Sequence, residues 1–119
     1  TAKESGADLG LEVYGKLDVT DANSFSDFLD QVERQLGPID VLVNNAGVLV
    51  AGRTLELDEA RLAEAMRINV LASALCAAAV AQGMRARGRG RIVNVAATSA
   101  FGTTAGGIAP HAIAKAGVV

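Results

Sequence analysis

The sequence has 119 residues, half of them apolar, and a formal net charge of −2 from 11 basic and 13 acidic residues. This length and apolar content suffice for one domain with a real core, and the lack of a basic surplus and of tryptophan argues against a nucleic-acid partner. The single cysteine, Cys76, forms no internal disulfide, so we expect a cytoplasmic protein. Gln82, Arg85 and Arg87 close the longest apolar segment, so we expect no membrane span.

The first predicted elements are a strand and a helix. Residues 11–17 alternate loosely between apolar and polar side chains, which predicts a strand that ends at Asp18. Apolar residues then recur at steps of three and four over residues 22–36, which predicts a helix with Thr20 or Asp21 at its N-cap. The glycine-proline pair that follows ends this helix.

The rest of the chain continues the alternation of strands and helices. Residues 39–44 are nearly all apolar, which predicts a strand covered by helices on both faces. A long helix over residues 58–84, a third strand over residues 91–96 and a helix around Pro110 follow. The predicted fold class is therefore α/β, a partial Rossmann-type doubly wound parallel sheet of order β-α-β-α-β-α, with residues 1–119 in a single domain.

The most informative motif is Asn44-Asn45-Ala46-Gly47, directly after the second predicted strand. Such a turn lies at the carboxyl edge of the sheet, where open α/β folds bind ligands, and its small residues allow close approach of backbone to a ligand. With Leu17-Asp18-Val19 upstream, the strand Arg91 to Val95 downstream and Lys115 near the end, it resembles the short-chain dehydrogenase/reductase family over essentially the whole chain.

The resemblance implies an oxidoreductase that uses NAD or NADP to move a hydride between the nicotinamide and a small-molecule alcohol or carbonyl substrate. Family members are longer and begin with a glycine-rich nucleotide loop and two strands, so we expect this chain to be an internal piece of a larger domain. Dimers and tetramers are common in such families, which predicts a homo-oligomer. The residues that the resemblance assigns to the cofactor are Asp18, Val19, Asn45, Ala46, Gly47 and Lys115.

Two polar residues have alternative interpretations. Asp18 and the Val19 amide would hold the adenine ring in the family scheme, whereas Asp18 could equally cap or turn the chain into the next helix. Asn69 lies on the apolar side of the long predicted helix and needs hydrogen-bond partners there. Those partners are a neighbouring helix or a buried water, or, as the resemblance implies, a water that leads to the catalytic lysine.

The sequence departs from the family pattern at the proton-transfer residues. Lys115 and position 111 share one helical face, and the family has a tyrosine four residues before this lysine, where this chain has His111. The serine expected to polarise the substrate carbonyl would fall at Ala96-Ala97. Thr98 or Ser99 offers a hydroxyl only if a longer loop shifts the register.

His111 therefore has two interpretations. Imidazole exchanges a proton near neutral pH and could replace the phenol, with Asn69, His111 and Lys115 as the catalytic set. Lys115 opposes this role, because a nearby cation disfavours imidazolium. The alternative function is a catalytically impaired homologue that binds nucleotide or acts as a scaffold, since Ala97 and His111 replace the expected serine and tyrosine.

No metal site is expected, because one histidine and one cysteine lack ligand spacing.

Overall fold

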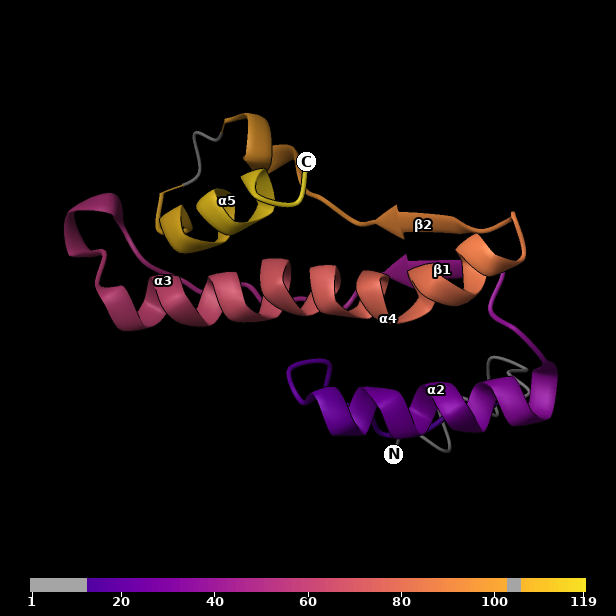
Figure 1. Cartoon of the computed structure of the whole chain (residues 1–119). Helices are drawn as coiled ribbons and strands as arrows, with labels where there is room; N and C mark the ends of the chain where they lie inside the picture. Colours follow the sequence, from indigo (N-terminus) through magenta and orange to yellow (C-terminus); the bar gives the residue numbers. More distant parts are fainter. Residues whose placement is uncertain (1–12, 103–105) are drawn as a thin grey trace.

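The computed structural model describes residues 13–102 and 106–119. Three helical segments and a two-stranded sheet form the main body, with a last helix near the carboxyl ends of the strands (Figure 1). The helices and strands are α2 (Ala22–Leu36), β1 (Val41–Asn44), α3 (Glu59–Met66), α4 (Ala72–Ala86), β2 (Arg91–Asn94) and α5 (Ala109–Ala116). Three shorter elements are 3₁₀ turns at Thr54–Glu56 and Thr98–Phe101 and a π-helical turn at Arg67–Leu71.

The sheet is parallel, as the alternation of strands and helices predicts. β1 pairs with β2 in a register that places Val41 opposite Arg91 and Asn44 opposite Asn94. The Val95 amide also donates to the Asn44 carbonyl at 3.0 Å, so the two chains remain hydrogen-bonded just past the strand ends. The α/β class is thus confirmed, and both strands are shorter than the predicted ranges 39–44 and 91–96.

The predicted first strand is wrong for the residues that can be judged. Residues 13–17 form no strand, and residues 11 and 12 lie outside the described part of the chain. Alternation of side chains suits a strand only when another strand supplies hydrogen-bond partners, and in the described sheet β1 pairs with β2 alone. Leu17 instead lines a groove beside α2. The described order is therefore α-β-α-β-α.

Local sequence signals fix both ends of α2, as predicted. The Asp21 side chain accepts a hydrogen bond from the Asn23 amide at 3.0 Å, which caps the first turn. At the other end, Gly37 has a φ of +90°, which a side chain would strain, and its amide donates to the Glu33 carbonyl at 3.1 Å.

α3, the π turn and α4 form one continuous helix over Glu59–Ala86. Its most buried residues follow one face at steps of three and four: Ala65, Asn69, Ala72, Cys76, Val80 and Met84. The helix has 28 residues, and an 18-residue stretch of it has a mean hydropathy of 1.4, which by length and composition alone would suffice to cross a membrane. Core helices pass the same test, so it assigns no membrane location. The expectation of no membrane span therefore stays a prediction.

The helix covers the sheet on one side only. α4 runs alongside β1, with α2 on one flank and β2 and α5 toward the other (Figure 1). The Val41 and Val43 side chains remain 58% and 54% exposed. The prediction that helices cover both faces of this strand is therefore wrong for the described residues, and apolar strand surface is left open.

Candidate functional site

The candidate site lies where β1 and β2 end and α5 begins. The Gly52 amide donates to the Gly107 carbonyl at 2.8 Å, and the Ala109 amide donates to the Gly52 carbonyl at 2.9 Å. These two bonds attach the start of α5 to the segment that follows β1. They place His111 and Lys115 beside the turn that contains Gly47 and Val48.

Asn44 joins the two strands at this edge. Its Nδ2 donates to Asn94 Oδ1 at 2.9 Å and to the Ser73 carbonyl of α4 at 3.0 Å. Both donors of the amide are therefore used within the protein. Asn44 therefore bridges the two strands and fixes the sheet edge against the long helix.

Asn69 is the most completely bonded polar side chain of the site, with 1% of its surface exposed. Its Oδ1 accepts from the Val48 amide at 3.2 Å, and its Nδ2 donates to the Val48 carbonyl at 3.1 Å and to the Ala65 carbonyl at 3.0 Å. The buried position predicted from the helical pattern is confirmed. Partners from a neighbouring segment satisfy the amide, while the predicted water toward the lysine remains a prediction.

Gly47 must be glycine because of this amide. A Cβ at position 47 would lie 2.6 Å from Asn69 Oδ1 and 3.4 Å from Lys115 Nζ. Real side chains essentially never approach an oxygen as closely as 2.6 Å, so a substitution must displace the Asn69 amide or the turn itself. The same distances show that the turn after β1 brings the backbone against both Asn69 and Lys115.

Lys115 is buried, with 7% of its surface exposed. Its Nζ donates to the Val95 carbonyl at 2.7 Å, just past the end of β2. No carboxylate of the described residues lies within ion-pair distance. An ammonium has three donors, so this buried group retains hydrogen-bonding capacity beyond the Val95 carbonyl.

His111 lies one turn before Lys115 on α5, as the spacing predicts. Its Nδ1 lies 3.0 Å from the Val48 carbonyl. The side chain is partly buried, and its nearest polar contact is thus the same peptide group that Asn69 holds. The structure therefore brings together Gly47, Asn69, His111 and Lys115.

A family model described as short chain dehydrogenase matches residues 1–119. The chain belongs to the short-chain dehydrogenase family. It is similar to a gluconate 5-dehydrogenase of Gluconobacter oxydans, with 38% identity over 85% of this chain and 39% of the relative. A relative from Xanthobacter autotrophicus named inactive 2-(S)-hydroxypropyl-CoM dehydrogenase 2 is 34% identical over 99% of this chain and 51% of the relative.

The crystal structure of a putative short-chain dehydrogenase/reductase from Burkholderia xenovorans superposes with a TM-score of 0.80 and 35% identity, over 87% of this chain and 40% of that chain. The likeness confirms the Rossmann fold that the motifs predicted. The chain spans between about two fifths and half of the length of these relatives.

In this member of the family the place of the expected serine is occupied by alanine. Ala97 is extended, with φ −147° and ψ 154°, and directly precedes the 3₁₀ turn Thr98–Phe101. Thr98 is exposed, whereas Ser99 Oγ is buried and has no hydrogen-bond partner among the described residues. Of the two hydroxyls considered from the sequence, only that of Ser99 is held inside the protein.

Asp18 lies away from this cluster, in the turn that leads into α2. Its Oδ1 accepts from the Thr20 hydroxyl at 2.7 Å and from the Thr20 amide at 2.9 Å. These bonds to Thr20 hold the pKa of the exposed Asp18 carboxyl below its usual value. The turn-forming role is therefore observed, while the adenine role remains a prediction.

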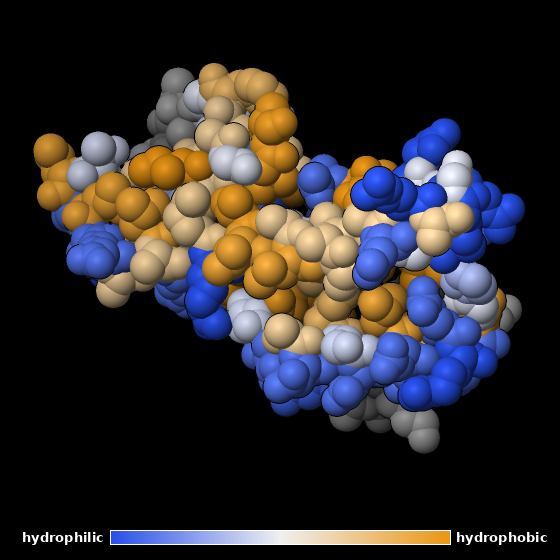
Figure 2. Space-filling view, in the orientation of Figure 1, coloured by the Kyte–Doolittle hydropathy of each residue, from blue (hydrophilic) through white to orange (hydrophobic). Residues whose placement is uncertain are grey.

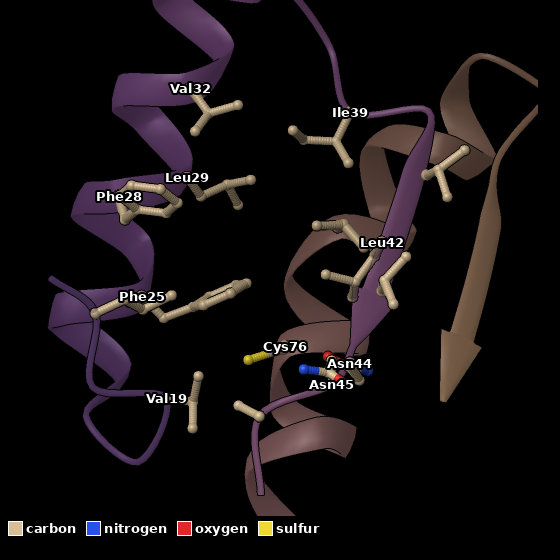
Figure 3. A pocket seen from close by; sticks show the side chains of 15 residues that line it. Val19, Phe25, Phe28, Leu29, Val32, Ile39, Leu42, Asn44, Asn45 and Cys76 are labelled. Carbon is tan, nitrogen blue, oxygen red and sulfur yellow. The ribbon is translucent and has the colours of Figure 1, made fainter. Parts of the chain in front are cut away.

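Val19 contributes to an apolar groove of about 310 Å³ between α2, β1 and α4. Figure 3 shows Phe25, Leu29 and Val32 facing Ile39 and Leu42 across it, with Asn44 and Asn45 near one end. Cys76 also lines the groove, and burial raises the pKa of its thiol. Val19, Asn45 and Ala46, three of the predicted cofactor residues, thus line one cavity, separate from the contacts of Lys115.

Sequence reasoning missed two contributors, Val48 and Val95. Each acts through its backbone carbonyl, which accepts from His111 or Lys115. A valine carries no polar side chain that would single it out, and these contacts join positions 63 and 20 residues apart. The available signal was positional, since Val48 directly follows the Asn44–Gly47 motif and Val95 lies near the end of the predicted strand 91–96.

Proposed function

We propose that the protein is an NAD- or NADP-dependent oxidoreductase that transfers a hydride between the nicotinamide and a small alcohol or carbonyl substrate. The observation that carries the proposal is Lys115, a buried ammonium at the carboxyl ends of both strands that uses a backbone carbonyl and no carboxylate of the described residues. A buried cation with unused donors suits polar ligand atoms such as ribose hydroxyls.

The residues around Lys115 fit such a cofactor. Gly47 has no side chain, and its Cα lies against the Asn69 and Lys115 side chains, so the turn presents bare backbone at the sheet edge. We assign the nicotinamide ribose to Lys115 and the adjoining nucleotide to Asn45, Ala46 and Gly47, with Asp18 and Val19 near the adenine. Bound NAD or NADP would supply the site that gains or loses the hydride.

His111 is the proposed proton-transfer residue. In the oxidative direction it takes the hydroxyl proton of the alcohol while the hydride leaves the carbinol carbon, so the alcohol becomes a carbonyl and the dinucleotide is reduced. The buried Ser99 hydroxyl, which has no hydrogen-bond partner within residues 13–102 and 106–119, is the candidate donor to the substrate oxygen.

The test is a calorimetric titration of the whole protein with NADH and NADPH, followed by an absorbance assay with secondary alcohols and ketones. Lys115→Met should raise the Kd of the preferred cofactor roughly tenfold to a hundredfold, because it removes a charge-assisted hydrogen bond. Arg85→Met, which removes a charge from an exposed position on α4, is the matched control and should bind normally. Equal affinity in wild type and Lys115→Met would contradict the proposal.

A second candidate function is supported by Ala97 and His111, and by the relative whose name includes the word inactive. In that case the protein binds nucleotide without turnover. Restoring the expected pair with Ala97→Ser and His111→Tyr separates the two functions. A working enzyme has measurable activity before the change, whereas an impaired homologue binds cofactor, lacks activity and gains it only in the double variant.

We also propose that the protein is cytoplasmic, that residues 1–119 belong to one domain and that it forms a dimer or tetramer. Exposed apolar side chains support self-association: Figure 2 shows hydrophobic residues across the middle of the molecule, and on the long helix Leu71 and Leu75 are each 53% exposed. Sedimentation analysis of Leu75→Lys should show a smaller species than wild type. An unchanged species would remove this support.

A further inference from the structure

One peptide group connects Asn69 to His111. The Val48 carbonyl accepts from Asn69 Nδ2 at 3.1 Å and lies 3.0 Å from His111 Nδ1, while the Val48 amide donates to Asn69 Oδ1 at 3.2 Å. Asn69 thus bonds the N–H and the C=O of residue 48, which belong to two successive peptide groups, and so fixes the direction of the Val48 carbonyl. His111 contacts the same oxygen from another helix.

This contact determines which nitrogen of the His111 ring has the proton. A carbonyl oxygen only accepts hydrogen bonds, so an Nδ1 atom 3.0 Å away must donate. In a neutral imidazole the proton on Nδ1 leaves the lone pair on Nε2. With the described residues Nε2 forms no hydrogen bond, so it is the ring atom available to exchange a proton.

We infer that Asn69 is a positioning residue for His111: through the Val48 peptide it holds the ring in the Nδ1–H tautomer and keeps Nε2 as the proton acceptor. The effect of this tautomer on catalysis rests on the proposed function, in which His111 transfers the proton. In the described residues the Asn69 side chain bonds Val48 and Ala65, and no hydrogen bond joins it directly to His111. It acts on the ring only through the orientation of the Val48 carbonyl.

Burial makes the arrangement rigid. Asn69 is 1% exposed, and both of its Nδ2 donors are used, on Val48 and on the Ala65 carbonyl one turn earlier in its own helix. The amide therefore cannot rotate without leaving buried polar groups unpaired. If Asn69 is removed, the Val48 peptide is free to turn and the ring is free to interconvert between tautomers.

The direct test is nitrogen-15 NMR of the ring. Long-range proton–nitrogen correlation spectra of the whole labelled protein, recorded where the imidazole is neutral, distinguish a protonated Nδ1 from a protonated Nε2. His111→Gln assigns the signals by their loss. The expected result is one tautomer with the proton on Nδ1, and a proton on Nε2 in the wild-type protein would overturn the inference.

Two variants test the role of Asn69. Asn69→Ala should convert the single tautomer into a mixture, whereas Asn44→Ala, which removes a comparable amide that does not touch Val48, should leave it unchanged. A single Nδ1–H tautomer that persists in Asn69→Ala would refute the positioning role. The wild-type spectrum tests the contact independently if that variant does not fold.

Kinetics then separates this inference from the proposed function. Asn69→Ala should lower kcat about tenfold with little change in cofactor affinity, and the loss should disappear in a His111→Gln background. A loss of equal size in that background would contradict action through the ring. Absence of cofactor binding in wild type would instead refute the proposed function, while the NMR result would still decide the tautomer.

Discussion

Two regions of the described structure are held together by different interactions, the strand ends by hydrogen bonds and α2 by apolar contact. Around the strand ends, hydrogen bonds join segments from across the chain, and the polar groups of Asn44, Asn69 and Lys115 find partners there. Around α2, contact is almost wholly apolar, none of its residues is fully buried, and an open groove separates it from β1. The comparison shows that hydrogen bonds can fix the side chains of a polar site even when the hydrophobic surface beside it is only partly buried.

The two regions should also respond differently to substitution. The site depends on a few close contacts, such as those of Gly47 with Asn69 and Lys115. The groove depends on the total apolar area removed from water, which many side chains share. Substitutions should therefore have sharp effects at the site and graded effects along the groove.

The largest effect is expected at Gly47. Gly47→Ala places a Cβ 2.6 Å from Asn69 Oδ1, so the turn or the amide must move, at a cost of about 2 kcal/mol in the free energy of unfolding. Denaturant unfolding measures this cost. Gly106→Ala is the control, since a Cβ there meets nothing within 4 Å, and equal losses in both variants would show that the site is not tightly packed.

A smaller loss is expected from a methyl deletion in the groove region. Val80 is 5% exposed on α4, so Val80→Ala should lower the free energy of unfolding by about 1.5 kcal/mol. Leu36→Ala, at a position 52% exposed near the end of α2, should change it by less than about 0.5 kcal/mol. Similar losses from both would indicate that the end of α2 is covered in the whole protein.

Cys76 is 4% exposed at the wall of the open groove, and its reactivity reports whether this part of the groove excludes solvent. Burial raises the pKa of its thiol, so at neutral pH the reactive thiolate should be scarcer than in an exposed cysteine, and labelling by a disulfide reagent should be slow. The rate should rise with pH and increase by at least about tenfold in denaturant. Labelling as fast in the native as in the unfolded protein would show that the groove opens readily.

The smallest effect is expected at the turn before α2. Thr20→Val removes the hydroxyl that donates to Asp18, so the pKa of this carboxyl should rise toward its usual value, while the Thr20 backbone bond is kept. Because the native pKa is lowered, the bond stabilises the fold above the unfolded-state pKa and loses its effect as the pH falls. NMR titration of the Asp18 carboxyl measures the shift, and Thr54→Val on an exposed turn is the control.

Much of the site was predictable because helical spacing is local. The four-residue step placed His111 and Lys115 on one face of α5, and the apolar pattern placed Asn69 on the buried side of the long helix. The glycine of the Asn44–Gly47 motif was predicted to allow close backbone approach, and the structure gives the reason in the Asn69 amide. Each of these features depends on neighbours within a few residues.

Pairing between distant segments was less predictable. Residues 11–17 have the alternation of a strand, but alternation does not supply a partner, and residues 13–17 have none in the described sheet. Neighbouring signals did not reveal Val48 either, because its role arises only when residues 48, 69 and 111 meet. Hydrogen bonds between such segments depend on the whole fold.

By itself, the sequence determined the family, the α/β class, the caps of α2 and the residues that gather at the strand ends, since motifs and periodicity are properties of short segments. Only the tertiary structure decided that Asn69 and His111 meet at one carbonyl and that Lys115 is buried without a carboxylate among the described residues. The physical reason is that the direction of a hydrogen bond is set by three-dimensional geometry, which residue spacing does not contain.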